Sequence, residues 1–449
     1  MEKIKLSEMF KFENIILSIQ HLLAMYAGAV AVPLLIAGAF GFTAEQTAYL
    51  VATDIFVCGI ATLLQVLRGR FVGVGLPVVM ASTFTSVGPM IAIGTNPELG
   101  PAYAFGGVLI AGAIMLLIAP IFAKLSKLFP PLVQGVVVAL IALTLTPVAI
   151  DNVAGGAGSA DYGSIDNLLI AGATFLTILL ISKFAKGFLQ SISILIGIVV
   201  GMIVAGLFGS LDFSSVTAAS WFQIPVPFKL ATPQFDVGAI ISMTIVGIVT
   251  FIETTGYYLG VAGMSNIKLK EADFRRGYTS SALAFVFSGI FNTSPQTSFS
   301  QNLGVIQTSG VKKREVILNL VALMLLAGLV PKIGAFATAV PAAVLGGALI
   351  FLFGNVLAYA ISVIGAQDLS GNNGLIVGAS LIIGLGVTVA PDAFANIPNW
   401  LSWITSSGIV AGTLAILILN LIFNGIEKDE DYDGDMAEAM PVESTTNVE

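Results

Sequence analysis

Three ionisable side chains lie alone inside long apolar runs of the sequence. His21 follows Gln20 in the first run, Asp54 lies in the second, and Glu253 lies near the middle of a later one. Because such groups are costly inside a membrane, they are kept where they bind a solute or carry a proton. Glu253 is the strongest candidate, since a buried carboxyl can hold a proton or accept a hydrogen bond from a ligand N–H. A helix–helix hydrogen bond is the alternative for His21 and Glu253, and tethering of a neighbouring backbone break is favoured for Asp54.

Two apolar runs are interrupted by polar residues in a way that indicates a binding site. The run 76–93 holds the cluster STFTS around Phe84, and the stretch 292–310 holds 12 polar residues in 19, with Phe299 inside it. Irregular backbone survives inside a membrane only where it lines a cavity or is buried in protein. Broken segments in corresponding halves of a chain are typical of transporter sites. Loops, or helix contacts built from small residues, are the alternative.

The remaining chemistry favours a neutral, planar solute that forms many hydrogen bonds. No Lys or Arg lies deep in an apolar run to hold an anion, and no cluster of acids could bind a metal ion. A single histidine excludes an HExxH zinc helix, and a single cysteine excludes intrachain disulfides and iron–sulfur clusters. Outside the acidic tail the chain has 18 basic and 17 acidic residues, so it has no basic face for nucleic acid. We expect no metal, no cofactor and no enzyme activity.

The composition requires these groups to be positioned inside a membrane. Of 449 residues, 56% are hydrophobic and 10% are charged, and the mean hydropathy is +0.96. A soluble domain carries about 25% charged residues, whereas a membrane span needs about 20 apolar ones. We therefore predict an all-α polytopic membrane protein. Its fourteen spans are expected near 15–38, 46–67, 76–93, 103–122, 131–150, 165–182, 189–209, 237–262, 277–290, 296–310, 314–331, 338–364, 373–390 and 406–425.

The distribution of lysine and arginine orients these spans. With the N-terminus in the cytoplasm, 17 of the 19 basic residues fall on the inside and only Lys229 and Lys332 fall outside. This matches the excess of positive charge that cytoplasmic loops carry. If either interrupted span were left out of the count, the basic residues would no longer fall mainly on one side of the membrane. Both spans are therefore expected to cross the membrane, and both termini are predicted to be cytoplasmic. The tail 427–449 has nine acidic residues and no apolar periodicity, and is predicted to be disordered.

A weak internal repeat divides the chain into two halves. FPPLVQG at 129–135 is similar to AVPAAVLGG at 339–347, at an offset of 211. STFTS at 82–86 is similar to TSFSQ at 297–301, at an offset of 215. Each half would hold seven spans, and because seven is odd the halves must have opposite orientations. The sequence therefore predicts the inverted repeat of secondary transporters.

Several motifs resemble those of the nucleobase–ascorbate transporter family, and most closely bacterial xanthine and uric acid permeases. The most specific is QNLGVIQTSG at 301–310, preceded by FNTSPQTSFSQN. QHLLAMYAGAVAVP at 20–33 resembles the family's Gln-His motif, and FIETTG at 251–256 resembles its glutamate motif. GLPVVMASTFTSVGPMIAIG and PPLVQGVV also match. The resemblance covers about 15 to 425, which is nearly all of the chain except the tail.

The resemblance implies a mobile core domain and a gate domain that often dimerises. A short strand is expected in each of spans 3 and 10. The expected units are a cytoplasmic N-terminal segment 1–14, core segments 15–122 and 237–331, gate segments 131–209 and 338–425, and an acidic cytoplasmic tail 426–449.

The resemblance also implies roles for single residues. Glu253 would hydrogen-bond the base and take part in proton coupling, and Gln301 would bind the opposite part of the ring. Ser300 and Phe84 would lend backbone groups, and the Phe84 ring would pack on the base. Four further residues would support the site without being its main contacts: Gln20, His21, Phe299 and Asn302. Of these, His21 would tie the first span to the site and Asn302 would support the broken helix.

The implied activity is import of an oxopurine across the plasma membrane by proton symport with an elevator-like motion. Xanthine is favoured, with uric acid second, because uracil transporters of the family carry Glu where this chain has Gln301, and an amide both donates and accepts. The chain departs from many relatives at Ser281, where they place an acid, so the coupling ion stays open between proton and sodium. A uracil or other nucleobase permease, or an uncoupled channel of the same fold, remains as the alternative.

Overall fold

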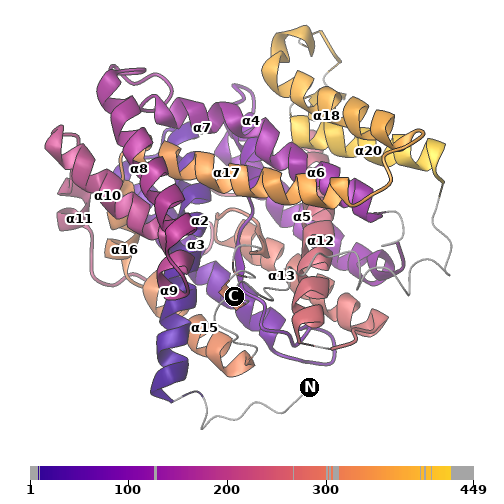
Figure 1. Cartoon of the computed structure of the whole chain (residues 1–449), viewed down its shortest axis with the longest axis horizontal. Coiled ribbons are helices and arrows are strands. Elements are labelled where there is room, and N and C mark those ends of the chain that lie inside the picture. The colour runs from indigo at the N-terminus through magenta and orange to yellow at the C-terminus, as the bar shows by residue number, and fades with distance from the viewer. Residues whose placement is uncertain are drawn as a thin grey trace, which may run out of the picture.

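The computed structural model describes residues 9, 11–125, 129–265, 267–299, 302, 305, 306, 313–394, 396–398, 401–405 and 407–425. Within this part the chain is mostly helical, with two short strands (Figure 1). The first half contains α2 (Phe12–Ala39), α3 (Ala44–Val66), β1 (Met80–Ser82), η1 (Phe84–Ser86), α4 (Val87–Gly94), α5 (Pro101–Leu125), α6 (Pro131–Thr144), α7 (Thr146–Val153), α8 (Ile165–Phe184), α9 (Phe188–Ser191) and α10 (Ser193–Leu207).

The second half repeats this order. After the short α11 (Ser214–Ala218) it contains α12 (Val237–Met264), α13 (Glu271–Ile290), β2 (Gln296–Ser298), α15 (Arg314–Gly328), α16 (Pro331–Thr338), α17 (Ala342–Gly365), α18 (Asn373–Val389), η3 (Pro391–Phe394), α19 (Ser402–Thr405) and α20 (Gly408–Phe423). Each half therefore has two long helices, a strand, and then further helices.

The predicted polytopic membrane fold is confirmed, although helix length and apolar composition alone identify only some of the predicted spans. Seven described helices or helix pairs are long and apolar enough to cross a membrane, and α15 with α16, bent by 78°, makes an eighth. Three predicted spans are shorter apolar helices, α10, α18 and α20. α13 begins with a charged turn, and the third and tenth segments are interrupted by strands. A described element lies in each of the fourteen predicted segments, but of the tenth only 296–299, 302, 305 and 306 belong to the described residues. That all fourteen cross the membrane stays a prediction.

The packing of the helices repeats between the two halves. α5 of the first half packs against α13 of the second, and α15 of the second half packs against α3 of the first. In the same way α8 packs on α10, while α18 packs on α20 (Figure 1). The pairs α17 with α8 and α6 with α18 correspond as well. Every one of these contacts has its counterpart when the halves are exchanged, as an inverted repeat requires.

By these contacts the helices fall into two groups. α2, α3, α4, α5, α12, α13, α15 and α16 pack chiefly on one another, and so do α6, α7, α8, α10, α17, α18 and α20. Contacts between the groups are fewer; the most extensive joins α2 to α10, and smaller ones join α12 to α6 and α20. The two strands belong to the first group.

The strands join the interrupted segments of the two halves. β1 and β2 pair antiparallel, with Met80 opposite Ser298, Ala81 opposite Thr297, and Ser82 opposite Gln296. The ladder continues past the strands, since Thr83 N donates to the Pro295 carbonyl (2.9 Å) and Phe299 N donates to the Val79 carbonyl (2.9 Å). All six paired residues are buried. The pairing satisfies backbone groups that would otherwise be left without partners in an apolar environment.

Glycines allow α5 and α13 to touch backbone to backbone. A Cβ atom added at Gly112 on α5 would lie 2.6 Å from Val286 N on α13. One added at Gly289 on α13 would lie 2.6 Å from Leu109 N on α5. Small residues at such contacts let two helices approach closely enough to gain dispersion energy inside a membrane.

We expect Gly289→Ala to destabilise the protein by about 1–3 kcal/mol, the usual cost of overpacking a closed contact. The matched control is Gly378→Ala on α18, where an added Cβ meets no atom within 4 Å. That change should be neutral or stabilising by up to about 1 kcal/mol, because alanine favours the helix. Thermal unfolding in detergent measures both. An unfolding temperature for Gly289→Ala at or above that of the wild type would contradict the packing.

Candidate functional site

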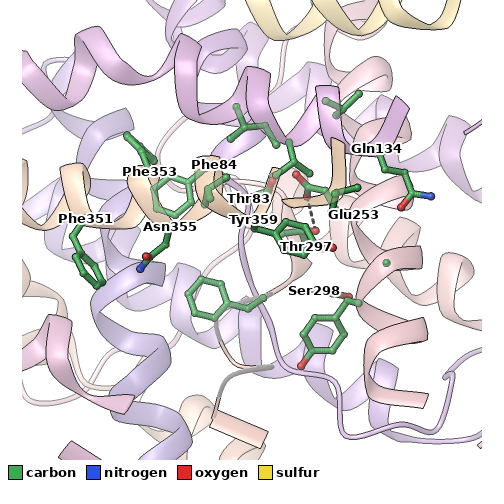
Figure 2. Close-up of a pocket in the computed structure, with 18 of the residues that line it drawn as sticks. Thr83, Phe84, Gln134, Glu253, Thr297, Ser298, Phe351, Phe353, Asn355 and Tyr359 are labelled. Carbon is green, nitrogen blue, oxygen red and sulfur yellow. Dashed lines mark hydrogen bonds between the residues drawn. The ribbon is translucent and has the colours of Figure 1, made fainter. Parts of the chain in front are cut away.

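A cavity of about 630 Å³ lies between the strand pair and the second group of helices. One wall comes from β1, η1, β2 and α12, and the other from α6, α9, α10 and α17 (Figure 2). The cavity therefore lies on the boundary between the two groups of helices. Its polar and aromatic lining includes Ser82, Thr83, Phe84, Gln134, Gln190, Ser191, Glu253, Tyr257, Thr297, Ser298, Phe299, Phe353, Asn355 and Tyr359.

Glu253 is the only acidic side chain among the described lining residues. Both interrupted segments bind it: Thr85 Oγ1 donates to Oε1 (2.7 Å), and Thr297 Oγ1 donates to Oε2 (3.0 Å). Figure 2 shows Glu253 beside Thr297. α12 carries the carboxylate about halfway along its 28 residues. The arrangement fixes both oxygens in place while the residue still lines the cavity, so it can accept further hydrogen bonds from a solute.

Aromatic rings form part of the same wall. The Phe84 ring meets the Phe353 ring of α17 edge to face, with centroids 5.3 Å apart and planes at 87° (Figure 2). The Phe299 ring packs on α2 at Gly28, where an added Cβ would lie 2.6 Å from Phe299 Cζ. Phe84 and Phe299, predicted from their positions in the interrupted segments, therefore both line the cavity. Their faces can contact a planar solute.

Three further predicted residues, Gln20, His21 and Asn302, do not line the cavity. His21 Nδ1 is 2.8 Å from Asn302 Oδ1, both side chains are buried, and neither lines the cavity. This bond links α2 to the segment that follows β2. Gln20 Nε2 instead donates to Ser191 Oγ (3.0 Å), which joins the two groups of helices beside the cavity. Ser300 and Gln301 lie outside the described residues, so their predicted contacts stay predictions.

Asp54 tethers the backbone breaks, as its sequence position suggested. Its carboxylate accepts hydrogen bonds from Ser82 of β1, from Ser294 (2.8 Å) and from Gln296 of β2 (3.2 Å). Cys58, one turn later on α3, also contacts it and lies 2.7 Å from Gln296 Oε1. The thiol is thus part of a polar cluster.

Three polar residues on the far wall were not predicted. Gln134 on α6 and Tyr359 on α17 both approach α12 near Gly256, where an added Cβ would lie 3.7 Å from Gln134 Oε1 and 3.9 Å from the Tyr359 hydroxyl. Asn355 lies one turn before Tyr359 and lines the same cavity (Figure 2). The available signal was an amide or phenol in an otherwise apolar run. Such residues are also common at helix contacts, so the signal was not specific.

Together the fold and the site define a membrane transporter: a solute-sized cavity adjoins two broken helices and a buried carboxylate inside a helical inverted repeat. The chain belongs to the permease family, whose model matches residues 12–393. This is the nucleobase–ascorbate transporter family that the motifs indicated, and its members are permeases and not enzymes.

Relatives with known names support this assignment. The chain is 46% identical to the xanthine permease of Bacillus subtilis, over 94% of this chain and 97% of that one. It is 44% identical to uric acid permease PucK of the same species, over 91% and 94%. It is 41% identical to uric acid transporter UacT of Escherichia coli, over 93% and 87%.

Solved structures agree on the fold. The transmembrane domain of the cyanobacterium bicarbonate transporter BicA superposes with a TM-score of 0.61 at 18% identity, covering 92% of this chain and 98% of that one. The murine anion transporter Slc26a9 in its inward-facing state gives 0.62 at 13% identity, covering 94% and 70%. At these identities the likeness concerns architecture alone.

We expect Thr85→Val to weaken solute binding by about tenfold, because a hydrogen bond to a charged group is worth about 1.5–3 kcal/mol and orients Glu253. Thr250→Val is the matched control, since the Thr250 hydroxyl binds the Val246 carbonyl of its own helix. The measurement is the concentration of xanthine that gives half-maximal uptake. Xanthine is chosen because the relative from Bacillus subtilis is named for it. Equal values for both variants would mean that Thr85 does not organise the site.

Proposed function

We propose that this protein imports an oxopurine nucleobase, with xanthine as the first candidate and uric acid as the second. The observation that carries the proposal is the Glu253 carboxylate, fixed by Thr85 and Thr297 in a cavity with aromatic walls. The relatives named for xanthine and uric acid, at 41–46% identity over nearly the whole chain, support it.

The chemistry of the cavity suits the edge and the face of an oxopurine. A ring N–H can donate to Glu253, and the Phe84 ring can stack on the base. We propose that Gln301 binds the opposite part of the ring and that Ser300 and Phe84 contribute backbone groups. The supporting residues would be Gln20, His21, Phe299 and Asn302. An amide at position 301 can both donate and accept, which matches an edge carrying N–H and C=O groups.

The two groups of helices suggest how the solute crosses. The group containing the strands would be the mobile core, built from 15–122 and 237–331, and the other the gate, built from 131–209 and 338–425. Because the cavity lies between them, sliding of the core along the gate would carry the site across the membrane. This is an elevator-like mechanism, and the small number of contacts between the groups supports it.

The cavity would face the cytoplasm in this conformation. With both termini inside, Gln134 and Gln190 lie at inner ends of their helices, and Tyr359 lies in the inner part of α17. Tyr359 is 44% exposed although it lines the cavity. Phe84 and Phe353 are 8% and 5% exposed, so their edge-to-face contact would close the deep end. We further propose that the protein acts at the plasma membrane as a homodimer joined through its gate domains.

Proton symport is the proposed coupling. Glu253 can take up a proton because it lines the cavity and has no lysine or arginine partner among the described residues. The alternatives are a uracil or other nucleobase permease and an uncoupled channel. Competition between solutes and the response to a protonophore separate these from the proposal.

The test is uptake of labelled xanthine by cells that lack their own purine permeases but express this protein. Excess unlabelled uric acid should block saturable uptake, uracil should not, and a protonophore should abolish accumulation. No xanthine uptake by protein that has reached the membrane would refute the oxopurine assignment. Uptake that resists the protonophore would instead indicate sodium coupling or an uncoupled route.

We expect Glu253→Gln to abolish accumulation, because the amide keeps the shape of the side chain but cannot carry a proton. It also turns one acceptor oxygen into a donor facing Thr85 or Thr297. Asn355→Ala, also at the cavity, is the control for a polar lining residue outside the proposed coupling, and should keep accumulation. Membrane insertion is verified by the amount of protein in isolated membranes. Full active uptake by the Glu253→Gln variant would contradict the proposed role of Glu253 in proton coupling.

A further inference from the structure

Asp54 is a second buried carboxylate at the heart of the molecule, 1% exposed. It lies on the side of the strand pair away from the helix that carries Glu253. Its oxygen Oδ1 accepts from Ser294 Oγ and Gln296 Nε2, and Oδ2 accepts from Ser82 Oγ. Cys58 Sγ contacts Oδ2 at 3.8 Å. Three donors from the two interrupted segments therefore converge on one side chain, with the Cys58 thiol beside them.

The strand register connects Asp54 to Glu253. Successive residues of a strand point to opposite faces. Gln296 accordingly binds Asp54, and the next residue, Thr297, binds Glu253. On the other segment Ser82, the cross-strand partner of Gln296, binds Asp54, and Thr85 binds Glu253. The two carboxyls hold the same two segments from two sides.

No cation neutralises Asp54 among the described residues. No lysine or arginine there lies within ion-pair distance of it, and Cys58 is the titratable group that contacts it. Other titratable groups on the helices packed around α3 have partners other than Asp54. Among the uncharged and aromatic groups, His21 binds Asn302, Tyr26 binds the Ile333 carbonyl and Tyr278 binds Thr255. Among the charged groups, Asp273 pairs with Arg68 and Arg276, Arg314 binds the Val66 carbonyl and Lys332 binds the Val216 carbonyl. Glu13, Glu45, Glu271, Arg275 and Glu315 lie in the first five residues of their helices.

A carboxyl in this setting can be stable in both protonation states. Ionised, it accepts the three hydrogen bonds from Ser82, Ser294 and Gln296. Protonated, it must donate one, and a serine hydroxyl can rotate to accept it. Ser82 offers a route for the proton, because it binds Asp54 and also lines the cavity. A proton donor in the cavity can protonate Ser82 Oγ while the serine's own hydroxyl proton moves to Asp54 Oδ2. The serine ends unchanged and one proton has moved.

The matching position in the other half of the chain carries a hydroxyl. Asp54 is the eleventh residue of α3 and Ser281 is the eleventh of α13, the matching helix of the other half. Ser281 is fully buried and accepts an ordinary hydrogen bond from Gln65 Nε2 (3.0 Å). In this chain, therefore, only one of the two matched positions carries a carboxyl. A buried carboxyl inside a membrane is costly, which points to a functional reason for Asp54.

We propose that Asp54 is a second proton-carrying carboxyl of the transport cycle, which positions the strand pair and is linked to Glu253 through residues 82–85 and 294–297. The proposal rests on the proposed function, because it needs a cycle in which substrate and proton move together. Protonation of Asp54 would reorient a donor at Ser82 or Ser294 and so shift the segments whose threonines hold Glu253.

The test compares three variants in vesicles containing the full chain. Asp54→Asn keeps the shape but cannot carry a proton, and Ser82→Ala removes the proposed route. Thr62→Val is the matched control: Thr62 Oγ1 accepts from Met80 N of β1 (3.0 Å), so this change loosens the strand without removing an ionisable group. Exchange of labelled xanthine without a gradient reports binding and movement, and accumulation driven by a proton gradient reports coupling.

Asp54→Asn and Ser82→Ala should both lower the ratio of accumulation to exchange, whereas Thr62→Val should keep the wild-type ratio. A wild-type ratio in Asp54→Asn would overturn the proposal, and so would an equal loss in Thr62→Val. If the wild type exchanges no oxopurine at all, the proposed function fails first. If it exchanges xanthine without proton-driven accumulation, the proton coupling and the Asp54 proposal fail together while the oxopurine assignment stands. If the wild type accumulates xanthine and Asp54→Asn keeps the wild-type ratio, the Asp54 proposal alone fails.

A second measurement avoids variants that do not fold. Infrared spectra of the wild-type protein, with and without ¹³C-labelled aspartate, identify bands of protonated aspartate by their isotope shift. We expect such a band to change when xanthine is added. Absence of any xanthine-dependent aspartate band across the pH range of transport would overturn the proposal, whatever the variants do.

Discussion

The pairing of β1 with β2 is the constraint on which the rest of the structure depends. Two helices that break inside a membrane leave backbone N–H and C=O groups that lipid cannot satisfy. Here each break satisfies the other through the antiparallel ladder, and Thr62 and Asp54 of α3 add side-chain bonds. Because the ladder fixes the register, it also fixes where Thr85 and Thr297 lie, and these hold Glu253. The site is therefore a consequence of how two broken helices complete each other.

The same pairing explains why the two halves must be interleaved. β1 can meet β2 only if helices of one half pack among those of the other, and α5 with α13 and α15 with α3 do so. Gly112 and Gly289 let the first of these pairs approach at backbone distance. The second group of helices takes no part in the ladder. It meets the first along a boundary where the cavity lies, so one wall of the site is set by the ladder and the other by separate helices.

The sequence predicted what depends on composition and local pattern. Apolar run lengths predicted the positions of the long helices, and polar interruption predicted the two breaks. A lone carboxyl in an apolar run pointed to Glu253. The sequence did not predict Gln134, Asn355 or Tyr359 as wall residues, because which face of a helix meets a cavity depends on distant packing. The partners of Asp54 could not be predicted either, because Ser294 and Gln296 lie 240 and 242 residues further along the chain. The contact of Phe84 with Phe353 joins residues from different halves of the chain, and no local sequence pattern predicts that they meet.

The free energies of the contacts between and within the two groups of helices indicate where relative motion costs least. Across the boundary, the Phe84–Phe353 pair is worth about 0.5–1.5 kcal/mol, and the hydrogen bond from Gln20 to Ser191 about as much. Within the first group, by contrast, separating the strands would leave several buried backbone groups unpaired at about 1–3 kcal/mol each. It would also strip the donors from two buried carboxyls. A motion that keeps the ladder intact and exchanges the boundary contacts is therefore the least costly one available. In the proposed mechanism a solute binds at Glu253 and a proton at either carboxyl. Both would then bind on the ladder side of that boundary and travel with it.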